Sequence, residues 1–338
     1  MERRTFLKSA AATGITAAAA NSLSQSPAPL ASQKRPESPN MIYRELGKTG
    51  ERVSAIGMGG YHLGKSPDAD ASIKLIRQGV DSGITFLDNS WDYNDGLSEV
   101  RMGWALRDGY RQKVFLMTKL NGRTKDSWNK QLEQSLGRLQ TDVIDLVQLH
   151  EVIRLEDPDR FFTPDGAAEA ALAARQAGKL RYVGFTGHKD PLVHLRMLEI
   201  AKQHNFHFDT VQMPVNVMDA HFRSFTKDVM PVALEQGIGI LAMKTFGDHF
   251  ILDSNTVKPI EALHYSLTLP ISVVITGIDS PQILEQALTA ARTFKPMSQT
   301  EIASLLSRTR EAALTGKYEL FKTTNHFDGT AHRPESLG

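Results

Sequence analysis

Short apolar runs alternate with longer amphipathic segments along the chain from about residue 41 onward. The apolar, β-branched runs predict strands at 53–58, 84–88, 114–119, 144–149, 182–185, 210–213, 238–243 and 272–276. Helical spacing between them predicts helices at 69–82, 98–107, 125–138, 166–177, 190–204, 224–236, 258–269 and 280–292, and an added helix at 298–314. Short buried strands separated by such helices are typical of a parallel sheet.

The strand–helix pattern predicts an α/β fold, namely a (β/α)8 TIM barrel. In front of it, IYRELGKTGERVSAIGMGG predicts two short strands around a Gly-bearing turn, an N-terminal β-hairpin. After the extra C-terminal helix, we expect the tail to pack as a strap or loop. A doubly wound sheet would tend to carry G-x-G-x-x-G after its first strand, but AIGMGGYHLG lacks it, and the next helix is expected only near Asp68.

Residues 1–31 have the layout of an export signal, with Arg3, Arg4, Phe6, Leu7 and Lys8 ahead of a small, weakly apolar run. These residues resemble the twin-arginine consensus; the alternative is a disordered alanine-rich leader. We therefore expect a Tat-type signal peptide at 1–31, a polar linker at 32–40 and a barrel with its C-terminal extension at 41–338. The Tat translocase is then a partner, and the protein is expected in the periplasm. The apolar run is too short to span a bilayer, so no stable membrane insertion is expected after cleavage.

The composition excludes several kinds of functional site. The 39 basic and 38 acidic residues nearly balance, which gives no indication of a nucleic-acid partner. The chain has no cysteine, so a thiolate nucleophile, a cysteine-ligated metal and an iron–sulfur cluster are excluded. We expect no metal cofactor.

Three successive predicted strands end in side chains that can move protons. Asp88 ends the second strand and Tyr93 follows it, Lys119 ends the third strand, and His150 ends the fourth. Parallel barrel strands place such ends at one mouth. An ammonium beside a phenol favours the phenolate and lowers the pKa of the phenol, and a carboxylate keeps the ammonium charged. An imidazole can orient a carbonyl. This set assists hydride transfer, and the hydride must come from a cofactor.

The motifs FLDNSWDY, MTKL and LVQLH, together with the early hairpin, resemble the aldo-keto reductase family over about residues 41–315. The resemblance implies a catalytic tetrad of Asp88, Tyr93, Lys119 and His150. Tyr93 would be the general acid, Lys119 its pKa partner, Asp88 the anchor and His150 the group that orients the substrate. It also implies NADP or NAD as cofactor and a small carbonyl or alcohol substrate.

The same resemblance implies cofactor contacts along the later strand ends. The candidates are Asp88, Thr186, Gln212, Met243, Lys244, Gly247, Gly277, Ser280, Gln282 and Gln286. Family members often carry a basic residue for the 2′-phosphate and a Glu-Asn pair for the adenine; Gly277, Ile283, Gln286 and Ala287 stand there instead. The choice between NADP and NAD therefore stays open. Tyr61, Trp91 and His188 are candidates for the substrate pocket, with rim packing or a structural histidine as the alternatives.

Three functions remain possible from the sequence. The first is an exported carbonyl reductase or alcohol dehydrogenase that depends on a nicotinamide cofactor. The second is a binding or regulatory barrel with little turnover, which the altered adenosine end favours. The third is a sugar-active enzyme that oxidises its substrate transiently with a retained cofactor. Fold alone does not decide among them.

Overall fold

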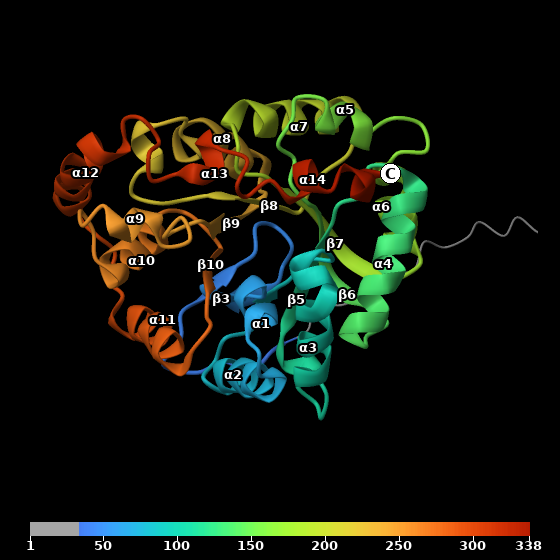
Figure 1. Cartoon of the computed structure of the whole chain (residues 1–338), viewed down its shortest axis with the longest axis horizontal. Coiled ribbons are helices and arrows are strands. Elements are labelled where there is room, and N and C mark those ends of the chain that lie inside the picture. The colour runs from blue at the N-terminus through green and yellow to red at the C-terminus, as the bar shows by residue number, and fades with distance from the viewer. Residues whose placement is uncertain (1–33) are drawn as a thin grey trace, which may run out of the picture.

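The computed structural model describes residues 34–338, whose centre is a closed barrel of parallel strands (Figure 1). The strands follow one another around the barrel as β3 (Ile56–Gly59), β4 (Phe86–Asp88), β5 (Phe115–Leu120), β6 (Ile144–Leu149), β7 (Leu180–Thr186), β8 (Thr210–Pro214), β9 (Gly239–Met243) and β10 (Val273–Gly277). β10 pairs with β3 and closes the ring. The predicted (β/α)8 fold is confirmed.

An outer ring of helices covers the barrel (Figure 1). Its members are α2 (Ala69–Asp81), α3 (Leu97–Ala105), α4 (Lys125–Leu139), α6 (Ala167–Gln176), α7 (Pro191–Gln203), α8 (Phe225–Gln236), α10 (Pro259–Thr268) and α11 (Pro281–Thr293). The added helix is α12 (Gln299–Ala313), as predicted. Sequence reading missed the short helices α1 (Tyr61–Lys65), α5 (Asp157–Phe161) and α9 (Phe250–Asp253), and the single turns η1 (Tyr93–Gly96), η2 (Arg111–Lys113) and η3 (Asp219–His221). Segments this short carry too few apolar repeats to show a helical period.

The predicted hairpin is present as β1 (Tyr43–Glu45) and β2 (Arg52–Ser54), which pair antiparallel. Its turn lies against the start of β9: Gly47 has φ +54°, and a Cβ there would meet the backbone nitrogen of Gly239 at 2.4 Å. Glycine is therefore required at this close approach. The strand predicted at 53–58 is two strands, because the chain leaves the hairpin at Ala55 to enter the barrel.

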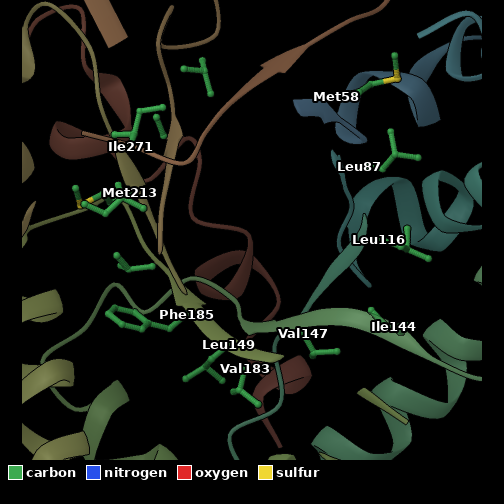
Figure 2. Packing of buried hydrophobic residues seen from close by; sticks show 14 of the residues in the cluster. Met58, Leu87, Leu116, Ile144, Val147, Leu149, Val183, Phe185, Met213 and Ile271 are labelled. Carbon is green, nitrogen blue, oxygen red and sulfur yellow. The ribbon is translucent and has the colours of Figure 1, made fainter. Parts of the chain in front are cut away.

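Alternate side chains of each strand fill two separate cores. In β5, Phe115 and Met117 point into the barrel interior, where Phe115 stacks on Phe86 with ring centres 5.4 Å apart. Leu116 belongs to the larger core between strands and helices, and Figure 2 shows it there with Val147. The barrel is therefore a filled core, and the functional space is restricted to its mouth.

The segment predicted as a linker is in part packed onto the barrel. Arg35 is 6% exposed, and its guanidinium lies 2.6 Å from Glu51 and 3.4 Å from Asp145. A charge that is buried needs such partners, which local polarity alone cannot reveal. The predicted signal peptide lies outside the described residues. Among the helices of residues 34–338, none has both the length and the apolarity needed to cross a bilayer.

The C-terminal strap, defined as residues 319–338, crosses the mouth of the barrel (Figure 1). It contains α13 (Leu320–Thr323), α14 (Gly329–His332) and the turn η4 (Pro334–Leu337). Its end is held beside α4, where the Arg123 backbone nitrogen donates to the Leu337 carbonyl at 2.8 Å. The expected strap is therefore an ordered cover over one side of the mouth.

Candidate active site

The C-terminal ends of β4, β5 and β6 bring the four predicted catalytic residues to one mouth. Asp88 is the last residue of β4, Tyr93 opens η1, Lys119 lies near the end of β5, and His150 directly follows β6. All four are buried or nearly so. The rings of Tyr93 and His150 meet edge to face with their centres 5.8 Å apart. Strand position alone thus assembles an acid, a phenol, an ammonium and an imidazole.

The Lys119 ammonium uses each of its three hydrogens. It donates to the Asp88 carboxylate, to the Asn89 carbonyl at 2.7 Å and to the Tyr93 phenolic oxygen at 3.1 Å. An ammonium has no lone pair and can only donate, so the phenolic oxygen accepts this bond. The phenolic hydrogen is left for another partner. The hydroxyl of Tyr93 is therefore oriented as a proton donor.

The acidity of Tyr93 differs from the sequence-based expectation. Burial, and after it the negative charges of Asp88, Asp92 and Glu151, raise the pKa of Tyr93 well above its ordinary value. The expected lowering by Lys119 is wrong as the net effect, because one ammonium does not outweigh desolvation and several carboxylates. The phenol is consequently protonated at neutral pH, as a proton donor has to be.

His150 is held from behind by three polar residues that sequence reading missed. Its Nδ1 lies 2.9 Å from Asn121 Oδ1, 3.2 Å from Ser90 Oγ and 3.4 Å from Asp92 Oδ1. Ser90 and Asp92 stand in the run NSWD, which reads as turn chemistry. The composition of an ordinary turn therefore hid two of the three partners, Ser90 and Asp92, in the sequence.

Three candidate cofactor residues meet at the ends of β7, β8 and β9. Thr186 pairs in register with Gln212, and the Thr186 hydroxyl lies 3.9 Å from the Met243 sulfur. Gln212 Nε2 donates to Asp88 at 3.2 Å, while Gln212 Oε1 is buried and has no hydrogen-bond partner among residues 34–338. Such a buried acceptor can receive a hydrogen bond from a bound group that donates.

The loop after β9 contains the next candidates, Lys244 and Gly247. Burial lowers the pKa of Lys244 to about 8, and its ammonium lies 3.9 Å from the centre of the Phe327 ring in the strap. Gly247 has φ +57°, a backbone conformation that favours glycine. Thr245, which sequence reading missed, is 3% exposed, and its hydroxyl has no partner within the described chain.

The residues that the sequence suggests for the adenosine end of the cofactor lie around the start of α11. None of these candidates is a lysine or an arginine. Ser280 caps α11, accepting from the Ile283 backbone nitrogen at 3.4 Å. Gln282 is exposed and Gln286 is half-buried on the same helix. His62 of α1 lies directly over Gly277, since a Cβ there would meet His62 Nδ1 at 2.5 Å. His62 was not predicted and enters this site from the first loop of the barrel.

The three candidate substrate residues have different positions. Tyr61 is 42% exposed at the rim, and its ring meets that of Tyr93 edge to face with centres 5.3 Å apart. The Trp91 indole N–H instead donates to Gln134 of α4 at 2.7 Å, which directs this side chain toward the helix ring. A single residue in a loop gives no sequence signal for the direction of its side chain.

His188 is buried beneath the strap. Its Nδ1 donates to the Phe321 carbonyl at 3.1 Å, because a carbonyl can only accept. Burial, and then the charge of Lys244, hold the pKa of His188 well below its ordinary value. His188 is therefore a neutral side chain with its Nδ1 already occupied, and the strap limits its access to a substrate.

The strap is tied to the same mouth by polar contacts. Glu151, beside His150, accepts from the backbone nitrogens of Gly329 at 2.9 Å and Thr330 at 2.6 Å. Asn121 also donates to Ser336 Oγ at 3.2 Å. These contacts join residues 178 to 215 positions apart in the sequence, which explains why no local pattern predicts them.

Comparisons with known proteins agree with the barrel fold. The sequence model of the aldo/keto reductase family matches residues 55–264. The chain is 29% identical over 222 residues to uncharacterized oxidoreductase YrpG of Bacillus subtilis, covering 60% of this chain and 65% of that protein. It is 32% identical over 160 residues to L-galactose dehydrogenase of Arabidopsis thaliana, covering 43% and 48%. It thus spans less than two thirds of either relative.

A solved structure shares the fold. The holo form of aldo-keto reductase AKR11C1 from Bacillus halodurans superposes with a TM-score of 0.66 at 21% identity. The superposition covers 79% of this chain and 96% of that one. At this identity the likeness supports the barrel architecture and carries no detail of substrate.

Proposed function

The chain belongs to the aldo/keto reductase family, and from this premise we propose that it interconverts a carbonyl and an alcohol with a nicotinamide cofactor. One observation carries the proposal. The buried Lys119 ammonium bridges the Asp88 carboxylate and the Tyr93 oxygen, so that the phenolic hydrogen is free to be donated. Few structural roles require a phenol, an ammonium and a carboxylate in this arrangement at a barrel mouth.

The residues present suit a nicotinamide dinucleotide. Gln212 Oε1 and the Thr245 hydroxyl are buried polar atoms without partners in the described part of the chain. The first is an acceptor, as the amino group of a carboxamide requires, and the second is a hydroxyl in the loop expected to meet the pyrophosphate. Gln212, Thr186 and Met243 would hold the nicotinamide end. A reduced nicotinamide bound there supplies a hydride.

The chain's own residues then handle the proton. Tyr93 donates its phenolic proton to the carbonyl oxygen, and in the reverse direction its phenolate takes the proton of the alcohol. Lys119 stabilises the phenolate through its existing hydrogen bond, and Asp88 keeps Lys119 charged in a buried site. His150 contributes a hydrogen bond that orients the substrate oxygen.

We propose a broad substrate class of aldehydes, ketones and sugars. One relative is named L-galactose dehydrogenase, which supports the inclusion of sugars beside simple aldehydes and ketones. To test the function, the purified protein is incubated with NADH or NADPH and a panel of these three substrate types, and cofactor absorbance is followed. Turnover that depends on both cofactor and Tyr93 supports the proposal. Tight cofactor binding without turnover across the panel would favour the binding barrel.

A further inference from the structure

A buried polar cluster behind His150 has no part in the proton transfer described above. Ser90, Asp92 and Asn121 are 0%, 7% and 1% exposed. They bond to one another: Ser90 Oγ lies 2.7 Å from Asp92 Oδ1, and Asn121 Nδ2 lies 3.1 Å from Asp92 Oδ2. Each of them also faces His150 Nδ1.

The hydrogen positions in this cluster follow from the chemistry of its members. An ionised carboxylate only accepts, so the Ser90 hydroxyl and the Asn121 amide nitrogen must both donate to Asp92. Asn121 therefore turns its oxygen, and Ser90 its lone pairs, toward His150 Nδ1, at 2.9 Å and 3.2 Å. Asp92 Oδ1 is a third acceptor at 3.4 Å. With acceptors on every side, His150 Nδ1 must carry a hydrogen.

The direction of the Asp92 pKa shift agrees with this count. Burial opposes it, but the charge of His150 and hydrogen bonds from His150, Ser90 and Asn121 outweigh burial and hold the pKa of Asp92 well below its usual range. Asp92 therefore keeps its charge throughout the range in which a histidine titrates.

We propose that Asp92 is a positioning residue that, with Ser90 and Asn121, fixes His150 in the Nδ1–H form. The other nitrogen, Nε2, then accepts a hydrogen bond when the ring is neutral and donates one only when the ring is cationic. For the proposed function, on which this consequence rests, His150 Nε2 donates to the substrate oxygen only when the ring is cationic. Because the forward and reverse steps pass through the same transition state, this holds for reduction and for oxidation alike.

Other charged or titratable groups around His150 and Asp92 also affect how this pair responds to pH. They come from the loop after β4, from β5 and the loop after it, from the loops after β6 and β7, and from the strap: Tyr93, Lys119, Arg123, Glu151, His188 and Arg333. Only Asp92 among the acidic groups lies within ion-pair distance of His150 in the described structure. Substitution of Asp92 therefore removes the one acidic group that acts directly on His150 in the described structure.

The tautomer is tested without any turnover. The full-length protein is labelled with ¹⁵N-histidine, and His150 is assigned by the signal that disappears in His150→Gln. At alkaline pH we expect Nδ1 to show the shift of a protonated nitrogen and Nε2 that of an unprotonated one. The reverse pattern overturns the inference, even for an enzyme whose proposed reaction is confirmed. An enzyme without detectable turnover can still show the expected pattern.

The kinetic consequence is tested with Asp92→Asn and the matched control Asp95→Asn. Asp95 lies in the same loop and pairs with Arg333 at the surface, so its substitution removes an equal charge away from His150. In Asp92→Asn, we expect the pH limbs of kcat/KM for reduction and for oxidation both to move to lower pH by about one unit or more. Profiles that coincide with those of Asp95→Asn contradict the inference. If Asp92→Asn does not fold, the tautomer measurement on the wild-type protein still tests the inference.

Discussion

The Lys119 ammonium lies 3.1 Å from the phenolic oxygen of Tyr93 and 4.6 Å from the centre of its ring. The bond fixes the direction of donation, because an ammonium cannot accept. Tyr93 is thus oriented by Lys119 although burial and nearby carboxylates raise the pKa of the phenol. In the proposed reaction, Lys119 positions the phenolic hydrogen and would stabilise the phenolate after that hydrogen has left.

Lys119→Met tests the buried ion pair as a structural unit. Asp88 would be left buried, with its side chain 4% exposed and without its cation. Breaking one side of such a pair costs about 3–5 kcal/mol of unfolding free energy. We expect this loss in urea unfolding, and substantial recovery in the double variant Asp88→Asn/Lys119→Met. Equal stability of the single and double variants would show that the pair is not coupled.

Gln212→Met tests the unpaired acceptor. Loss of one neutral hydrogen bond, worth about 0.5–1.5 kcal/mol, should weaken NADH and NADPH alike by about threefold to tenfold. Gln203→Met, at the exposed end of α7, is the control. Titration followed by tryptophan fluorescence measures both affinities. A change for one cofactor alone would place Gln212 near the adenosine end rather than the nicotinamide.

The preference between the two cofactors should be weak. The segment 277–286, which holds the adenosine-end candidates, contains no lysine or arginine. A charge-assisted contact to the 2′-phosphate is worth about 1.5–3 kcal/mol, and none is available from this segment. We expect NAD and NADP to bind within about tenfold of each other. A hundredfold preference for NADP would require a cation from another part of the chain.

Glu319 should make stability depend on pH. It lies at the start of the strap, where burial raises its pKa to about 7 although Lys322 is 3.0 Å away. Its pKa in the folded protein lies above the ordinary value of 4.5, so the folded state keeps a proton that the unfolded state releases. The resulting stability is full below about pH 4.5 and is lost as pH rises through about 7. Glu319→Gln should flatten this decline in the free energy of unfolding, measured with urea at several pH values. If the pH dependence of the variant runs parallel to that of the wild type, Glu319 is not its source.

The fold and the meeting of Asp88, Tyr93, Lys119 and His150 at one mouth could be predicted because they depend on local, periodic signals. Apolar runs marked the strands, and the residues that ended them, such as Asp88 and His150, had to meet at the mouth of a parallel barrel. The predicted strand and helix positions agree closely with the structure. Position in a strand is therefore enough to place a side chain at the site.

The remaining parts of the site depend on contacts that are distant in sequence or on side-chain direction. Asn121 meets His150 from a loop after a different strand, and Phe321 covers His188 from 133 residues away. Trp91 stands between two site residues in sequence, yet its indole packs toward α4. The sign of the Tyr93 pKa shift was misjudged for a related reason, since sequence shows the nearby ammonium but not the depth of burial.

The central claim is that Tyr93 donates the proton, and single-turnover reduction of a carbonyl by the preformed cofactor complex of Tyr93→Phe tests it most directly. Tyr61→Phe, whose ring centre lies 5.3 Å from that of Tyr93, is the matched control for loss of a phenol at the same mouth. We predict that Tyr93→Phe slows this step by about 10²–10⁴-fold with unchanged cofactor affinity, and that Tyr61→Phe slows it far less. Reduction by Tyr93→Phe at the wild-type rate would contradict the account.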